Sequence, residues 1–451
     1  MDPSSGGKYS LTEGGILRKL LLIAVPIMGT QFLQMAYNLT DMFWLGRVGS
    51  DAVAASGAAG MYMWLSFGFI LIGRMGAEIG VAQSLGRGDR QAARSFSQNA
   101  MVIALVLGLA FGLTLILFKR ELAAFFGFRE PQVAEDASVY LSIVGFSVPI
   151  TFISAVVVGT YNAAGNSRTP FLLNALGLAA NVILDPLFIL GLGMGVRGAA
   201  AATVISQMIA GILMIIAIIL FPDRPFDRYS FRLRPDKKKI LLILKWAIPI
   251  GLESILFCFL SMVTSRIEAS FGANVVAASK VGSQIESLSW LIGGGFGSAL
   301  VVFIGQNYGA GKAERIRRGV RISAAAMALW GILVSLFLFF AGGFVFSLFL
   351  PGPELQKLGV PYLRILAFCQ LFMNLEAVGA GAFKGTGRTI PPSLASIISN
   401  IIKPVLALIL SKTSLGLYGI WVAVCATAVL RGVWICLWYA LSGSISPRKT
   451  G

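Results

Sequence analysis

The sequence contains no histidine and only four cysteines among its 451 residues. The lack of histidine excludes a histidine proton relay or a histidine metal site, so any proton chemistry falls to carboxylates, tyrosines or lysines. All four cysteines lie inside apolar stretches, and their spacing matches no metal-ligand pattern. We therefore expect buried, reduced thiols and no cofactor.

Charged residues are also scarce, at 13% of the sequence against roughly 25% in soluble domains. Hydrophobic residues make up 56%, and apolar stretches long enough to cross a bilayer recur along the whole chain. No Walker motif for nucleotide phosphates is present, which argues against an ATP-driven pump. The fold class that follows is an all-α polytopic membrane protein without a separate soluble domain.

Twelve transmembrane helices are predicted, and both chain termini are expected on the cytoplasmic side. Most of the 37 Lys and Arg residues fall in the connections on one side, as the positive-inside rule requires. This distribution explains the net charge of +17 without nucleic acid as a partner, and it predicts a multi-pass protein of the cell membrane that functions as a monomer. The predicted spans are 16–45, 52–82, 95–118, 137–161, 171–191, 197–220, 240–270, 275–305, 318–348, 358–383, 392–411 and 416–441.

The two halves of the chain are repeats of one another. Pro26-Ile27 matches Pro249-Ile250, and the tetrapeptide VAAS occurs at 53–56 and again, at the same offset, at 276–279. Six spans in each half make the repeats parallel, related by a pseudo-two-fold axis along the membrane normal. We predict an N-terminal lobe (1–220), a charged cytoplasmic linker (221–239) and a C-terminal lobe (240–451).

Two aspartates interrupt the apolar pattern of the N-terminal half. Asp41 and Asp185 fall at similar depths in the first and fifth spans, where the second half has Thr264 and Lys403. A carboxylate inside a membrane is costly and therefore indicates function. Two neighbouring carboxylates can hold and release protons, or bind Na⁺ through their oxygens, so we expect this pair to couple transport to H⁺ or Na⁺.

Four further polar side chains are expected in the same layer: Tyr37 and Asn181, one helical turn from the two acids, together with Tyr140 and Thr203. They are candidate substrate or cavity residues. Pro26 lies inside the first span, where a proline removes a backbone hydrogen bond and favours a kink.

Charges inside the C-terminal half have two interpretations, mutual ion pairing or contact with substrate. They are Glu253, Arg266, Glu268, Lys280, Glu286, Glu376 and Lys403. Among them we select Glu253, Glu286 and Lys280 as candidate substrate or coupling residues.

Several motifs together resemble the multidrug and toxic compound extrusion (MATE) family, most closely its DinF-type branch. They include YNLTDMFWLGRVG (37–49), GTYNAAGNSRTP (159–170), NVILDPLFILGLG (181–193) and GQNYGAGK (305–312). The resemblance implies a twelve-helix antiporter that exports organic cations against a proton or sodium gradient, with Asp41 and Asp185 as its coupling acids. Lys280 stands where relatives often have glutamine, which favours an anionic or zwitterionic substrate.

A secondary active multidrug efflux antiporter, working by alternating access, is therefore the leading hypothesis. The alternative is a flippase for lipids or lipid-linked precursors, which would need a basic cavity; Lys280 and Lys403 keep it open. An intramembrane enzyme would need a nucleophile–base pair or a metal set, and the sequence offers neither. A channel is disfavoured because the two-lobed repeat with a single acidic site suits alternating access.

Overall fold

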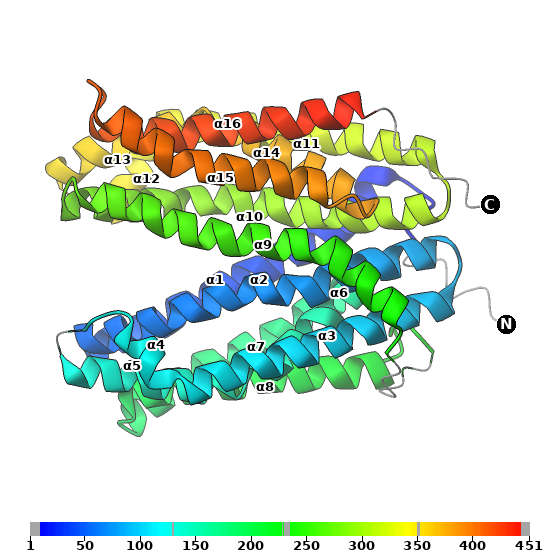
Figure 1. Cartoon of the computed structure of the whole chain (residues 1–451), viewed down its shortest axis with the longest axis horizontal. Helices are drawn as coiled ribbons and strands as arrows, with labels where there is room; N and C mark the ends of the chain where they lie inside the picture. Colours follow the sequence, from blue (N-terminus) through cyan, green and yellow to red (C-terminus); the bar gives the residue numbers. More distant parts are fainter. Residues whose placement is uncertain (1–9, 129, 228, 230–234, 350–351, 443–451) are drawn as a thin grey trace. The chain divides into compact units, whose positions relative to one another are not determined.

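The described residues of the computed structural model are 10–128, 130–227, 229, 235–349 and 352–442, and they are helical without a β-strand (Figure 1). Helix by helix, the chain contains α1 (Ile16–Val48), α2 (Ser50–Gly86), α3 (Arg90–Leu117), α4 (Lys119–Ala124), α5 (Pro131–Gly145), α6 (Val148–Ala163), α7 (Arg168–Pro186), the π-helix η1 (Leu187–Gly191), α8 (Gly195–Leu220), α9 (Lys237–Ala269), α10 (Ala273–Gly309), α11 (Ala313–Phe340), α12 (Gly342–Phe349), α13 (Pro353–Ala367), α14 (Gln370–Gly385), α15 (Ile390–Ser411) and α16 (Leu417–Leu441).

The prediction of twelve spans is confirmed. Ten of these helical stretches are long and apolar enough to cross a bilayer, and two bent pairs, α5 with α6 and α13 with α14, supply one span each. The bends are 49° and 46° and fall at corresponding places of the two repeats. Pro149 in the first turn of α6 explains the first bend, whereas α14 begins at Gln370 without a proline.

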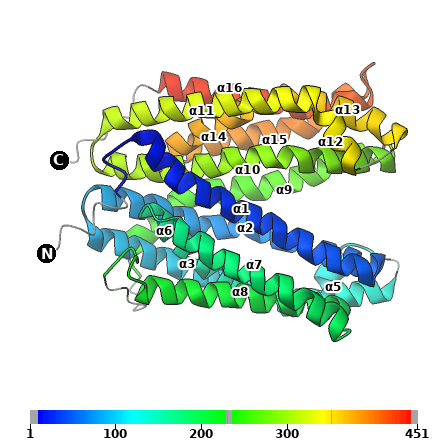
Figure 2. The ribbon, with the colours of Figure 1, turned by 180° about the vertical axis from the view of Figure 1, so that it is seen from behind.

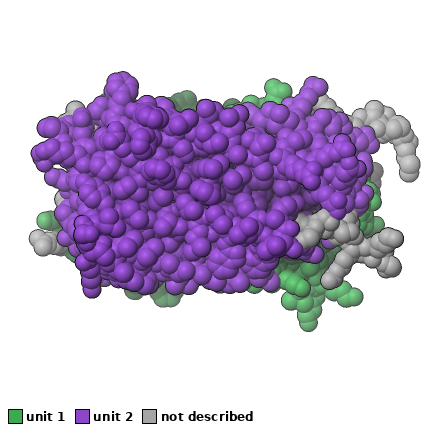
Figure 3. All heavy atoms as spheres, turned by 90° about the horizontal axis from the view of Figure 1, so that it is seen from above, with its two compact units in different colours: residues 1–10, 29–251 green, residues 11–28, 252–451 purple. Residues whose placement is uncertain are grey.

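Two compact units make up the chain, and their boundaries differ from the predicted lobes (Figure 3). Among the described residues, unit 1 contains residue 10 and residues 29–251, and unit 2 contains residues 11–28 and 252–442. Each repeat's first helix is therefore shared between the units. Residues 11–28 and 240–251 belong to the opposite unit from the one that the repeat predicted.

Packing near residues 28 and 29 explains why α1 is divided between the two units. Glycines in both units leave room for neighbours: a Cβ added at Gly295 of unit 2 would lie 2.5 Å from the Met28 side chain. One residue later along α1, a Cβ on Gly29 would lie 2.6 Å from the ring of Phe171 in unit 1. Close approach of this kind is the usual role of small residues between membrane helices.

The linker was expected to be a solvated loop, but its described part is anchored to unit 1. The Tyr229 and Ser97 hydroxyls lie 2.9 Å apart, and the backbone N–H of Asp236 donates to Asn99 Oδ1 at 2.8 Å. The Arg224 guanidinium donates to the Ile219 carbonyl at 3.1 Å. Burial raises the pKa of Tyr229 to about 12, so this hydroxyl stays protonated at neutral pH.

Within unit 1, α7 and α8 lie side by side, and α2, α3 and α6 pack on one another (Figure 2). Unit 2 repeats this pattern, with α15 beside α16 and with α10 and α11 on α14. Apolar cores fill both units. The start of α1 contributes fully buried Leu20 and Ile23 to the core of unit 2.

Candidate functional site

Asp41 on α1 and Asp185 on α7 are brought together through Asn181. The Asn181 side-chain amide donates from Nδ2 to Asp185 Oδ1 at 2.9 Å and to Asp41 Oδ1 at 3.3 Å. Asn181 and Asp185 are one turn apart on α7, so their side chains lie on the same helix face. Neither residue is exposed, whereas Asp41 is partly exposed.

Thr203 and Tyr140 complete the acid cluster from two further helices. The Thr203 hydroxyl on α8 donates to Asp41 Oδ2 at 3.2 Å. Tyr140 on α5 is buried beside Thr203. Four helices of unit 1 therefore converge on the carboxyl pair. Asp41, Asn181, Asp185 and Thr203 form one hydrogen-bonded group, and Tyr140 lies next to it.

Tyr37 lies one turn before Asp41, and its hydroxyl occupies space that a glycine leaves open. A Cβ added at Gly177 on α7 would lie 2.8 Å from the Tyr37 hydroxyl oxygen and 3.2 Å from the Ser206 carbonyl oxygen. The Ser206 side chain is fully buried beside this glycine. Sequence reasoning did not identify Gly177 or Ser206, because a glycine or serine in a membrane helix carries no signal of a neighbouring site.

Two oxygen atoms in the cluster are buried without a hydrogen-bond donor among the described residues, Asp185 Oδ2 and Asn181 Oδ1. Asp41 Oδ1 and Asp185 Oδ1 both accept from the same nitrogen, Asn181 Nδ2, so the two carboxyl groups are neighbours. Neighbouring carboxyl groups can hydrogen-bond to each other only when one of them carries a proton, since ionised carboxylates are acceptors only. The geometry therefore suits a carboxyl pair that holds one proton between its members.

The chemistry open to this cluster is binding and release of a small cation. All its members are neutral or acidic, so a positive charge has no basic competitor among them. A hard metal cation would find carboxylate, amide and hydroxyl oxygens here. Groups of three or more His, Cys, Asp or Glu residues that could hold a metal are absent from the described part of the chain.

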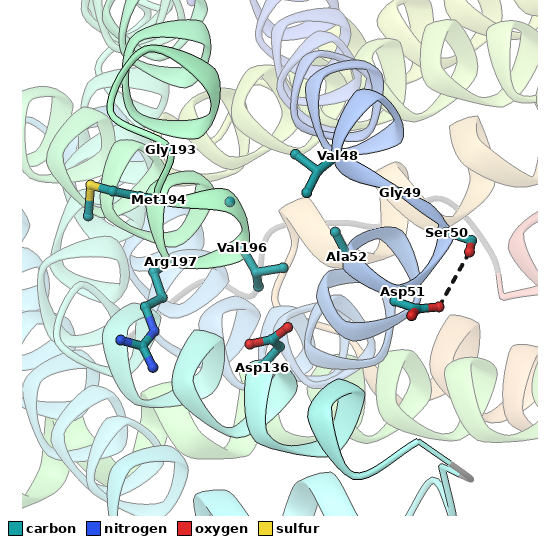
Figure 4. Close-up of a pocket in the computed structure, with 11 residues that line it drawn as sticks. Val48, Gly49, Ser50, Asp51, Ala52, Asp136, Gly193, Met194, Val196 and Arg197 are labelled. Atoms are coloured by element: carbon teal, nitrogen blue, oxygen red, sulfur yellow. Dashed lines mark hydrogen bonds between the residues drawn. The ribbon is translucent and has the colours of Figure 1, made fainter.

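A separate pocket of about 320 Å³ lies at the ends of the same helices (Figure 4). Val48 on its wall is seven residues beyond Asp41, or about 10 Å along α1, so the pocket is distinct from the acid cluster. Asp51, Asp136 and Arg197 contribute the charged side chains of its lining. We assign it no role.

The candidate residues of unit 2 do not form one cluster. Glu253 accepts a hydrogen bond from Ser393 at 2.9 Å and lies 3.9 Å from the Lys384 ammonium. Glu286 accepts a hydrogen bond from the Gln370 side chain at 3.0 Å and is mostly buried. Lys280 is exposed, and no ion pair of its side chain occurs among the described residues. The ion pair of Glu253 is made with Lys384, which is not among the charges selected from the sequence, so both interpretations of those charges stay predictions.

Comparison with known proteins identifies the family. The MatE family model matches residues 26–187 and 249–409, one stretch in each repeat. A relative from Thermotoga maritima, named "Probable multidrug resistance protein NorM", is 28% identical over 445 residues, covering 96% of this chain and 94% of that protein. The "FAD transporter" of Shewanella oneidensis is 25% identical and covers 94% of this chain and 95% of its own length.

A solved structure described as "Crystal structure of MATE in the bent conformation" has the same fold, with a TM-score of 0.91, 21% identity and 98% coverage of both chains. The resemblance inferred from sequence motifs is thus confirmed for the family, while the DinF-type branch stays a prediction. Because the family model covers well over half of the residues and both repeats, the chain belongs to the MatE family, and it is a membrane transporter rather than an enzyme.

Proposed function

We propose that the protein exports amphipathic organic cations in exchange for protons, which the Asp41–Asp185 pair carries. Relatives named as multidrug resistance proteins over nearly the whole length support the export of organic compounds. The H⁺ assignment is our own and rests on the carboxyl pair. We further propose that both termini are cytoplasmic, that the protein resides in the cell membrane, and that it works as a monomer.

The observation that carries this proposal is the pair of carboxyl groups that accept hydrogen bonds from the same Asn181 amide in a mostly buried setting. A proton held between Asp41 and Asp185 cancels part of their charge, which lowers the cost of keeping them away from water. When the proton leaves, the bare negative charge favours an organic cation in its place. Proton and substrate therefore compete for the same negative charge, which is the basis of exchange.

Alternating access would then expose this site to each side of the membrane in turn. Pro26 supports such a change, because α1 continues through it with one backbone hydrogen bond fewer. The boundary between the units follows both Pro26 and Pro249 by two residues. The role of Pro26 as a flexible point remains part of the proposal.

Transport by purified protein in liposomes tests the coupling ion. We expect uptake of the cationic dye rhodamine 123 into vesicles that are acidic inside, without Na⁺ on either side, because protons leaving the vesicle drive the dye inward. Nigericin should abolish the uptake by collapsing the pH gradient. Liposomes that contain the Asp41→Asn variant serve as the control for passive accumulation of the dye.

Two other outcomes contradict the proton assignment in different ways. Uptake driven only by a Na⁺ gradient would keep the site and make Na⁺ the coupling ion. No dye transport under either gradient would favour the flippase hypothesis, for which the basic residues of unit 2 are the relevant groups. The second result would be followed by an assay of lipid translocation in the same vesicles.

A further inference from the structure

The internal repeat places a second polar layer in unit 2, at the position that corresponds to the acid cluster of unit 1. Asp185 and Lys403 each precede a proline near the end of an apolar helix, α7 and α15 respectively. Asn181 and Asn400 also correspond, and both are buried. Unit 2 therefore carries a cation where unit 1 carries an acid.

Lys403 is buried, with 8% of its surface exposed. Its ammonium nitrogen lies 3.4 Å from Ser261 Oγ, a long hydrogen bond, and 5.1 Å from the centre of the Phe257 ring. No carboxylate oxygen of the described residues lies within 4 Å of it, in contrast to the Arg431–Glu376 pair of the same unit. A buried ammonium without a counterion is costly and retains unused hydrogen-bond donors.

Glu268 lies in the same layer, but other groups hold it. Ser279 and Trp421 lie beside its carboxylate, and it interacts electrostatically with Lys403 at longer range. The Trp421 indole N–H also donates to Ser279 Oγ at 3.2 Å. Glu268 thus offsets the charge of Lys403 without occupying its donors, and a ligand with charges of both signs suits the layer better than a dianion.

We propose that unit 2 contains a binding site for the carboxylate of a zwitterionic amphipathic substrate, with the Lys403 ammonium and the Ser261 hydroxyl as its donors. The Phe257 ring supplies an apolar surface beside the ammonium. The inference rests on the proposed export function and extends its substrates from cations to zwitterions. It also assigns to Lys403, and not to the exposed Lys280, the preference for an acidic group.

Two dyes that differ only in their acidic group test the site. Rhodamine 110 carries a free carboxylate, and rhodamine 123 is its methyl ester, so they present a zwitterion and a cation of the same shape. Binding of each dye to purified protein in detergent is measured by fluorescence polarisation. We expect Lys403→Met to raise the Kd for rhodamine 110 about tenfold or more, the loss of one charge-assisted contact, and to leave the Kd for rhodamine 123 unchanged.

Matched variants keep the outcome interpretable. Lys412→Met removes an exposed lysine at the end of α15 and should alter neither Kd. Lys403→Arg retains the charge and should retain most rhodamine 110 binding. The rhodamine 123 titration of Lys403→Met reports whether that variant is folded. The proposal is wrong if Lys403→Met weakens both dyes equally or leaves rhodamine 110 binding unchanged.

Failure of this inference can be told apart from failure of the proposed function. The titrations use detergent and no gradient, so they do not depend on the coupling ion. A selective effect on rhodamine 110 would support the site even if no pH-driven transport occurred. Normal transport of rhodamine 123 with no selective effect would reject the site and leave the antiporter intact.

Discussion

The Asp185→Asn variant is expected to lose pH-driven export, by about tenfold or more, while it still folds. Asparagine has nearly the same shape and can accept the hydrogen bond that Asn181 donates to Asp185 Oδ1. It cannot hold or release a proton, so the transporter has no proton to exchange for the substrate. A tenfold loss corresponds to about 1.4 kcal/mol. Initial rates of rhodamine 123 uptake into acidic vesicles, normalised to the amount of inserted protein, measure the effect.

Controls separate this loss from a general effect of removing an aspartate. Asp41→Asn should behave like Asp185→Asn, because the two carboxyl groups share one proton. Asp227→Asn removes a 90% exposed carboxylate whose partner Arg90 lies 3.6 Å away, and transport should stay normal. Thr264→Ala, at the position corresponding to Asp41, should also be nearly silent, because its hydroxyl donates to the Leu260 carbonyl of its own helix, its one hydrogen bond among the described residues. Full pH-driven export by either asparagine variant would remove that aspartate from the coupling site.

Removal of Glu376 is expected to destabilise the protein by about 3 to 5 kcal/mol, the usual cost of breaking a buried ion pair from one side. Arg431 Nε donates to Glu376 Oε2 at 2.6 Å between α16 and α14, and both side chains are about 15% exposed. Glu376→Leu leaves the guanidinium without a counterion inside a membrane protein. The unfolding transition in mixed micelles of neutral detergent and dodecyl sulfate measures the change.

The double variant distinguishes an uncompensated charge from a packing defect. Glu376→Leu with Arg431→Met removes both charges and should recover most of the lost stability, since apolar side chains can replace a buried pair without net cost. Glu354→Leu removes one member of an exposed ion pair with Lys357 and should leave the transition unchanged. Equal destabilisation in the single and double Glu376 variants would show that the charge is not responsible.

The acid cluster could be predicted from sequence because its members break a strong background pattern. In an apolar helix, the depth of Asp41 or Asp185 follows from counting residues, and the repeat shows that the second half lacks an acid at either place. Helical periodicity then adds Tyr37 and Asn181 as neighbours one turn away. Their convergence needs only that the helices lie in one lobe, which the short connections between them favour.

Features that depend on how one helix faces another could not be predicted in this way. The sequence shows Lys280 and Lys403 as charges inside the C-terminal half, but only the structure distinguishes the exposed lysine from the buried one. The room that Gly177 leaves for the Tyr37 hydroxyl depends on the approach of two helices. The division of each repeat's first helix between the two units could not be predicted either, because a repeat in sequence does not indicate which unit a helix contacts.

The central claim is that substrate and protons compete for the Asp41–Asp185 pair, and proton release on substrate binding tests it most directly. Purified protein in weakly buffered, Na⁺-free detergent solution is mixed with rhodamine 123, and a pH-sensitive dye records the protons that appear. We predict release by the wild-type protein and none by the variant that carries both Asp41→Asn and Asp185→Asn. Equal release by the two proteins, or binding by the wild type without any release, would contradict the claim.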